Sequence, residues 1–402
     1  MITPKIGYQI GVGNAKISSR ERRYVNEALK SNRLSPGRFT QQFENQFAKA
    51  HDCEYAVMCN SGTSALMTAI ATLKEVFAWK DGDEILVPAL TFVATVNVVL
   101  NANFTPVFVD IDPVTYNIDP TQIEAKITPR TRAIIPVHLF GLPCEMDPIL
   151  EIAKRKNLRI IEDSCETMFS TYKGKPVGSF GDMACFSTYV AHLLVTGVGG
   201  VVTMSDAKYH EIARSLINHG RDPIYITMDD DKTSEEEKFL RIVQRRFRFV
   251  RQGYSFRMTE MEAALGVGQL EQKDKILKGR RENASYLLRH LKKWNHFLQL
   301  PSWPKYAEHS FMMFPIMVRE PLSKWDLIVH LEKNNIETRE MVPLTNQPVY
   351  RKMFGEDFEA RYPHAKRVNE CGFYIGCYQD LSKKELDYII SKFDEFFKSQ
   401  VK

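Results

Sequence analysis

Long apolar runs, cysteine and net charge are all scarce in this 402-residue chain. No window approaches the roughly 18 to 20 continuous apolar residues that a membrane-spanning helix needs. Residues 1–16 also lack the apolar core of a signal peptide. We therefore expect a cytoplasmic protein with no membrane partner. The formal net charge of +5 is small and its basic residues are dispersed, so a nucleic-acid partner is not expected.

The seven cysteines are odd in number and lie among apolar neighbours. This pattern favours reduced core residues over a disulfide framework, and the spacings lack the close pairs of a zinc site. No cysteine stands between Cys185 and Cys371.

Apolar strand-like segments alternate with helical patterns through the first half of the chain. Strands that are apolar on both faces and separated by helices predict a mostly parallel sheet covered on both sides. We count seven such strands, at Tyr55–Cys59, Glu84–Val87, Pro106–Asp110, Ala133–Val137, Arg159–Asp163, Ala184–Ser187 and Gly200–Met204.

The remaining segments predict further helices and a second unit. Helices are expected at Ser18–Ser31, Phe39–Ala50 and from Thr259, while the charge-rich Met228–Lys238 has the composition of a solvated surface loop. From about Lys275 the periodicity changes to a second α/β pattern, with helices at Arg280–Leu291 and Ser323–Asn334, a strand at Phe311–Val318 and a terminal amphipathic helix. The predicted domains are therefore a large one, residues 1–274, and a smaller C-terminal one, residues 275–402.

Three motifs contain residues that could take part in catalysis or ligand binding. Ser61-Gly62-Thr63 stands between a strand and a helix, where backbone N–H groups can hold a phosphate, although any helix can begin with such a cap. Asp163 ends an apolar strand and is either a buried hydrogen-bonding partner or a charge partner for a protonated ring nitrogen. His192 lies among apolar residues and is either a satisfied core residue or a functional imidazole.

The order of the motifs resembles a known family. The segments NSGTSAL, VPALTFVAT, PVFVDIDPVTYNID, IIEDSCE, GSFGD, FSTYVAH, TGVGG and FRMTEMEAALG occur along nearly the whole chain in the family order. They are similar to those of the DegT-type sugar aminotransferases and their dehydratase relatives. The resemblance implies a fold type I transferase dependent on pyridoxal 5′-phosphate (PLP), acting as a homodimer.

The resemblance also implies roles for individual residues. Ser61, Gly62, Thr63 and Ser187 would hold the cofactor phosphate. Phe92 would stack on the pyridine ring, and Asp163 would pair with the ring nitrogen. Ser255 stands where the family usually has an asparagine that reaches the phosphate in the neighbouring subunit.

One position departs from the aminotransferases. Where they carry the lysine that binds PLP covalently, this chain has His192, and it offers no lysine between Lys175 and Lys208. The replacement resembles the sugar 3-dehydratases, such as GDP-4-keto-6-deoxymannose 3-dehydratase, which use the pyridoxamine form of the cofactor (PMP). Glu166 strengthens this resemblance, because those dehydratases have an acidic residue there and the aminotransferases usually glutamine.

The activity implied is removal of the C3 hydroxyl from a nucleotide-linked 4-keto-6-deoxy sugar, with L-glutamate as amino donor. His192, whose unperturbed pKa lies near neutrality, would act as general base and could then protonate the departing hydroxyl. Glu166 would be a second catalytic residue and would also contact the cofactor. The family suggests a role in cell-surface polysaccharide synthesis such as lipopolysaccharide. One branch of these dehydratases carries an iron–sulfur cluster, and the cysteine-free stretch after Cys185 predicts none here.

Two other readings stay open. The chain could be an aminotransferase that works without the lysine, or an inactive homologue that binds cofactor or sugar nucleotide. Release of ammonia distinguishes the dehydratase from the aminotransferase, while failure to react with glutamate favours the inactive homologue.

Overall fold

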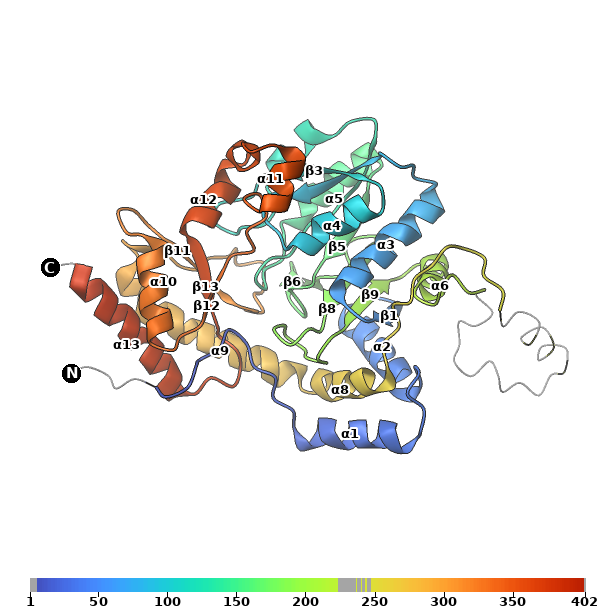
Figure 1. Ribbon diagram of the computed structural model, residues 1–402, viewed down its shortest axis with the longest axis horizontal. Coiled ribbons are helices and arrows are strands. Elements are labelled where there is room, and N and C mark those ends of the chain that lie inside the picture. Colours follow the sequence, from blue (N-terminus) through green and yellow to red (C-terminus); the bar gives the residue numbers. More distant parts are fainter. Residues whose placement is uncertain (1–5, 223–235, 237–239, 241–242, 244–246, 401–402) are drawn as a thin grey trace.

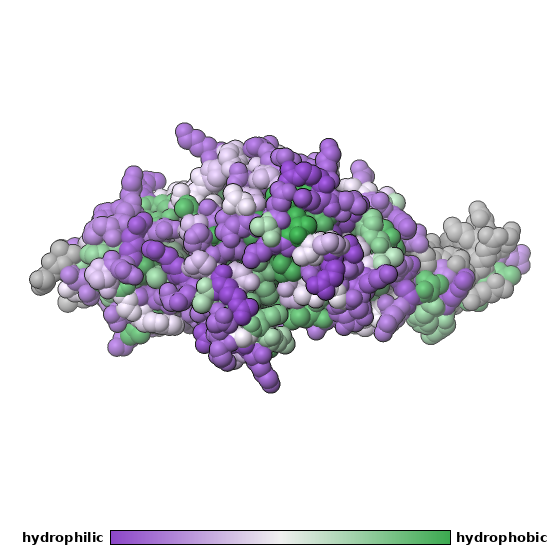
Figure 2. Space-filling view, turned by 90° about the horizontal axis from the view of Figure 1, so that it is seen from above, coloured by the Kyte–Doolittle hydropathy of each residue, from purple (hydrophilic) through white to green (hydrophobic). Residues whose placement is uncertain are grey.

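The computed structural model describes residues 6–222 and 247–400, together with residues 236, 240 and 243 (Figure 1). All but one residue of the predicted surface loop Met228–Lys238 lies outside the described residues, so its conformation stays a prediction. Among the described residues no helix is long and apolar enough to cross a membrane. The face drawn in Figure 2 is mostly hydrophilic, with hydrophobic patches near its middle.

A seven-stranded sheet forms the centre of the larger part. Its order is β1-β9-β8-β5-β4-β2-β3, and β9 alone runs antiparallel to its neighbours. The carboxyl ends of the other six strands therefore meet at one edge, beside the first residues of β9. All seven predicted strands are confirmed, as β1 (Tyr55–Cys59), β2 (Glu84–Pro88), β3 (Thr105–Val109), β4 (Thr131–Ile134), β5 (Arg159–Asp163), β8 (Met183–Ser187) and β9 (Gly200–Met204).

Helices cover this sheet and join it to the N-terminal segment. Ser18 caps the first helix through a capping box with Glu21, which explains why the serine signal located that helix correctly. Buried Glu260 accepts hydrogen bonds from the amides of Gly37, Phe39 and Thr40 and so caps the second helix from another element. The helices are α1 (Ser19–Lys30), α2 (Arg38–Ala50), α3 (Gly62–Phe77), α4 (Val93–Asn101), α5 (Met146–Lys156), α6 (Ala207–Leu216) and α8 (Glu260–Leu270), with short 3₁₀ turns η1 (Pro120–Gln122) and η2 (Glu124–Lys126).

The long helix α9 (Lys273–Leu291) links the two parts of the molecule (Figure 1). It begins at Lys273 rather than at the predicted Arg280. The helix predicted from Thr259 is α8, which already ends at Leu270. Residues 271–275 are all polar, so no apolar spacing marks this helix start in the sequence.

The second part contains a four-stranded antiparallel sheet of order β10-β11-β13-β12. Its apolar core also includes Ile6 and Ile10, so the N-terminal segment packs against this part. The boundary between residues 274 and 275 stays a prediction. The elements are β10 (Leu298–Gln299), β11 (Phe314–Val318), β12 (Thr338–Glu340), β13 (Gly372–Ile375), α10 (Lys324–Lys333), α11 (Pro348–Phe354), α12 (Pro363–Cys371), α13 (Lys383–Gln400), η4 (Lys292–Trp294) and η5 (Phe358–Arg361), beside the hairpin β6 (Thr171–Tyr172) and β7 (Lys175–Pro176) of the larger part.

Candidate active site

Three of the predicted segments meet at the carboxyl edge of the sheet, around Gly62. A Cβ added at Gly62 would lie 2.7 Å from Sγ of Cys165 and 2.9 Å from Cβ of Ser187. These distances leave no space for a side chain, so glycine is required for the close approach. The structure thus brings the start of α3, the segment after β5 and the end of β8 together.

The start of α3 has the features of a phosphate cradle. Ser61 is its N-cap, and its hydroxyl accepts a hydrogen bond of 3.0 Å from the amide of Ser64. Ser64 in turn donates to the side-chain oxygen of Asn60 at 2.6 Å. Thr63 is exposed in the first turn. Helix capping and phosphate binding are compatible here, because the remaining first-turn amides still point out of the helix.

Asp163 is a buried carboxylate held in a fixed orientation. It accepts a hydrogen bond of 2.7 Å from the hydroxyl of Thr95 and one of 3.2 Å from the amide of Cys165. Burial raises the pKa of its carboxyl, since desolvation disfavours the charged form. Thr95 has no distinguishing sequence signal beyond its place in VPALTFVAT, and sequence reasoning missed it.

Phe92 lies immediately before α4, whose first turn contains Thr95, the residue that donates to Asp163. Phe92 is 60% exposed, which is unusual for phenylalanine. An exposed aromatic ring at the edge of the site is available for stacking against a planar ligand.

Glu166 is buried three residues after Asp163. The amide of Phe140 donates to its carboxylate at 3.2 Å. Burial, together with the negative charge of Asp163, raises the pKa of Glu166 to about 7. This carboxyl can therefore exist in both protonation states near neutral pH.

His192 lies in the loop after β8 and is half-buried. Its Nδ1 is 3.1 Å from the carbonyl oxygen of Ser187, so Nδ1 carries the proton and Nε2 is the acceptor. Among the described residues, no hydrogen-bonding group contacts Nε2. Burial lowers the pKa of His192 to about 4, and the positive charge of Arg280 contributes. The pKa therefore lies below the near-neutral unperturbed value, because desolvation outweighs the hydrogen bond to Ser187.

A buried pair behind the site fixes the end of β5. The amide of Cys144 donates to Nδ1 of His138, so Nε2 of His138 donates to Glu162 at 3.1 Å. Burial alone would raise the pKa of Glu162, but hydrogen bonds from His138 and from backbone amides of residues 178–181 outweigh it and lower that pKa. Glu162 therefore anchors the GSFGD segment and has a structural role.

None of the described contacts of Ser255 is with another of the predicted site residues. It is exposed, forms a bridge with Asn218 and accepts a hydrogen bond of 3.3 Å from Arg257. The contact predicted for it belongs to a neighbouring subunit, and it stays a prediction.

Comparison with known proteins agrees with this arrangement. The model of the DegT/DnrJ/EryC1/StrS aminotransferase family matches residues 15–394. The chain belongs to this family. The family and the fold predicted from the sequence are both confirmed.

Relatives within the family have different activities. GDP-perosamine synthase of Caulobacter vibrioides is 34% identical over 391 residues, which cover 96% of this chain and 98% of the relative. GDP-4-keto-6-deoxy-D-mannose 3-dehydratase of Yersinia pseudotuberculosis is 29% identical over 398 residues, covering 96% and 100%. The E. coli enzyme of that name, solved with bound hydrated PLP, superimposes with a TM-score of 0.83 at 27% identity and covers 96% of this chain and 99% of its own. The family is thus one of sugar aminotransferases and sugar 3-dehydratases, and its solved members support the predicted cofactor.

Within the described ranges, no group of three or more His, Cys, Asp or Glu side chains could hold a metal ion. The absence of an iron–sulfur cluster stays a prediction.

Proposed function

We propose that this protein is a PLP/PMP-dependent 3-dehydratase that removes the C3 hydroxyl of a nucleotide-linked 4-keto-6-deoxy sugar, with L-glutamate as amino donor. The observation that carries the proposal is the tautomer and position of His192. Its Nδ1 proton is held by the Ser187 carbonyl, which leaves Nε2 as a proton acceptor in the family's lysine position. The sequence offers no lysine between Lys175 and Lys208 to take that position.

The residues present fit the cofactor. The amides and hydroxyls at the start of α3, with Ser187, would hold its phosphate, because a helix N-terminus favours an anion. The close approach at Gly62 keeps this cradle narrow. Asp163 is a buried carboxylate, and no described cationic side chain lies within ion-pairing distance of it. A protonated ring nitrogen of the cofactor would supply this cationic partner. Phe92 presents an exposed ring for stacking.

The bound cofactor supplies an electron sink that labilises bonds next to the sugar carbon to which its amine is attached. Nε2 of His192 is the atom at which this chain would take up a proton and deliver it to the departing C3 hydroxyl. A pKa of about 4 keeps the imidazole neutral and ready to accept. It also makes the protonated imidazole a strong acid toward the hydroxyl.

Glu166 is the second titratable group of the site. Its pKa of about 7 allows it to be protonated when the sugar binds, so that it donates a hydrogen bond to a sugar oxygen. The relatives named for GDP-linked sugars favour guanosine diphosphate as the nucleotide.

We further propose a homodimer. Tyr189, Val190 and Val198, on either side of His192 in the same loop, have exposed fractions of 50%, 40% and 52%. Apolar side chains exposed beside a site are typical of an interface. A second copy would cover them and bring Ser255 toward the partner's phosphate cradle. Sedimentation equilibrium would test this, and a monomer at micromolar concentration would contradict it.

The proposed activity is tested by single-turnover product analysis with PMP-loaded protein and a panel of GDP-, CDP- and dTDP-linked 4-keto-6-deoxy sugars. Mass spectrometry follows the sugar, and a coupled assay follows ammonia. Loss of the C3 oxygen with release of ammonia is the expected result. It would also identify the nucleotide.

An aminotransferase is the second candidate, because GDP-perosamine synthase is among the relatives at 34% identity. An amino sugar that retains the C3 oxygen would establish that activity and refute the dehydratase. The same experiment therefore decides between the two candidates.

A further inference from the structure

Arg280 is a fully buried arginine on α9, with an exposed fraction of 1%. Its Nη1 donates to the carbonyl oxygens of Phe311 at 3.1 Å and Met312 at 2.7 Å, and its Nη2 lies 3.5 Å from the carbonyl oxygen of His192. Its Nε has no hydrogen-bond partner in the described part of the chain. Among the ion pairs of the described residues, none contains Arg280.

A cation in this position is costly. A guanidinium stays protonated in proteins, and burying a charge without an ion-pair partner is unfavourable, although the negative charge of Asp380 offsets part of this cost. Its partners are instead backbone carbonyls from two segments that are far apart in the sequence, one in the His192 loop and one just before β11. Arg280 therefore links the loop that carries His192 to the C-terminal part of the molecule.

We propose that Arg280 is a positioning residue that fixes the His192 loop, so that the side chain at position 192 points at the reacting atoms. The proposal rests on the proposed function, since it takes position 192 to face the cofactor. Arg280 contacts the backbone of His192, so the link persists whatever side chain stands there. This makes the position of residue 192 measurable without the native activity.

The test places a lysine at position 192, so that the rate of its reaction with PLP reports how well this position is oriented. In purified His192→Lys protein loaded with PLP, the ε-amine should bond covalently to the cofactor, and borohydride should fix it irreversibly. The rate of this capture is followed by absorbance and by the mass of the intact chain. We then compare His192→Lys with His192→Lys/Arg280→Met, in which the side-chain volume is nearly kept but the three carbonyl contacts are lost. A shift of the loop by about 1 Å would slow capture on the order of tenfold to a hundredfold.

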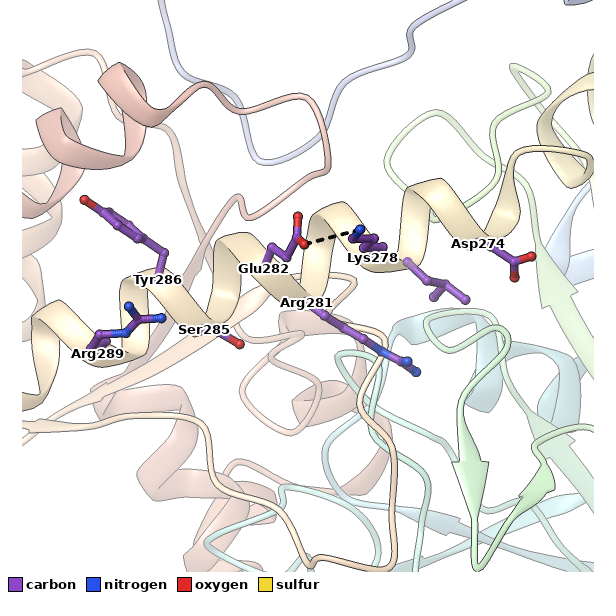
Figure 3. A pocket seen from close by; sticks show the side chains of 8 residues that line it. Asp274, Lys278, Arg281, Glu282, Ser285, Tyr286 and Arg289 are labelled. Atoms are coloured by element: carbon purple, nitrogen blue, oxygen red, sulfur yellow. Dashed lines mark ion pairs between the residues drawn. The ribbon is translucent and has the colours of Figure 1, made fainter.

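The neighbouring Arg281 supplies the matched control. Its Nε donates to the carbonyl oxygen of His309 at 3.0 Å, and its Nη2 donates to Glu308 at 3.1 Å, so it also ties α9 to the segment before β11. Figure 3 shows it among the residues of α9 that line a surface pocket, which has a volume of about 550 Å³. None of its described contacts is with the His192 loop. His192→Lys/Arg281→Met should therefore capture PLP at the rate of His192→Lys alone.

Arg280→Lys is the second variant, in case Arg280→Met does not fold. Lysine keeps the charge but cannot reach all three carbonyls as the guanidinium fork does, so capture should be slowed by less. All variants are compared in the His192→Lys protein. The proposal would be overturned if Arg280→Lys captured PLP as fast as Arg281→Met. It would also be overturned if Arg280→Met and Arg281→Met slowed capture equally. Failure of His192→Lys itself to capture bound PLP would instead refute the placement of residue 192, and with it the proposed function.

Discussion

Nδ1 of His192 lies 3.1 Å from the carbonyl oxygen of Ser187, the last residue of β8. Because a carbonyl oxygen only accepts hydrogen bonds, this contact selects the tautomer with the proton on Nδ1. Ser187 itself packs against Gly62 at the start of α3. A residue of the predicted phosphate cradle thus also sets the orientation of the imidazole, so in the proposed function cofactor binding and proton transfer would both depend on Ser187.

The first prediction concerns His192→Asn. Asparagine can still donate to the Ser187 carbonyl but cannot take up a proton, so turnover should fall about 10²- to 10⁴-fold. PLP affinity should change little, because the proposed anchors are the phosphate cradle, Phe92 and Asp163. Single-turnover rates and PLP titration measure the two effects separately. His296→Asn, at an exposed histidine, is the control. Unchanged turnover in His192→Asn would refute the assigned role.

The second prediction uses the raised pKa of Glu166. Its folded-state pKa of about 7 lies above the ordinary 4.5, so the folded state binds the proton more tightly than the unfolded state. This group's contribution to stability is therefore favourable below pH 4.5 and is lost as the pH rises through 7. At about 1.4 kcal/mol for each pKa unit, the loss is at most about 3.5 kcal/mol.

Glu166→Gln cannot ionise and should not show this loss. Relative to the unsubstituted protein, its free energy of unfolding should rise by about 1 to 3 kcal/mol between pH 5 and pH 8. Urea denaturation of cofactor-free protein at both pH values measures the difference. A constant difference between the two proteins would show that Glu166 is not desolvated as the structure has it.

The sheet could be predicted from the sequence because its strands are apolar on both faces, as at Arg159–Asp163, and need no partner to be recognised. The site residues were predicted where a motif marks them, as at Ser61-Gly62-Thr63. Thr95 and Arg280 were missed, since one threonine in a helix and one arginine of a consecutive pair have no local signal. Their roles depend on contacts across 68 and 88 residues of sequence, which only the fold supplies.

The same limit explains why the pKa of His192 could not be predicted. The sequence supplies only the unperturbed pKa near neutrality, whereas burial of the imidazole lowers the pKa to about 4. Burial depends on the segments that pack over the loop, and the local sequence does not identify them.

The third prediction concerns Glu162, which accepts hydrogen bonds from His138 and from the amides of Gly178, Phe180 and Gly181. Glu162→Ala leaves these donors buried without an acceptor and should destabilise the protein by about 3 to 5 kcal/mol. Thermal and urea denaturation would show it. Glu124→Ala, which removes an exposed ion pair with Arg155, should change stability little. Equal effects of both substitutions would contradict the anchoring role.

The last prediction tests the narrow cradle at Gly62. In Gly62→Ala the new methyl group would overlap Sγ of Cys165 and Cβ of Ser187, at 2.7 and 2.9 Å, and force these segments apart. Alanine is the better helix former, so any loss must come from this crowding. PLP affinity, measured by titration, should fall about tenfold, which corresponds to about 1.4 kcal/mol. Gly7→Ala is the control, because a Cβ there meets no atom within 4 Å. Adding Cys165→Ala to Gly62→Ala removes the nearer contact and should restore part of the affinity. If Gly62→Ala binds PLP as tightly as the unsubstituted protein, the cradle does not hold the cofactor phosphate.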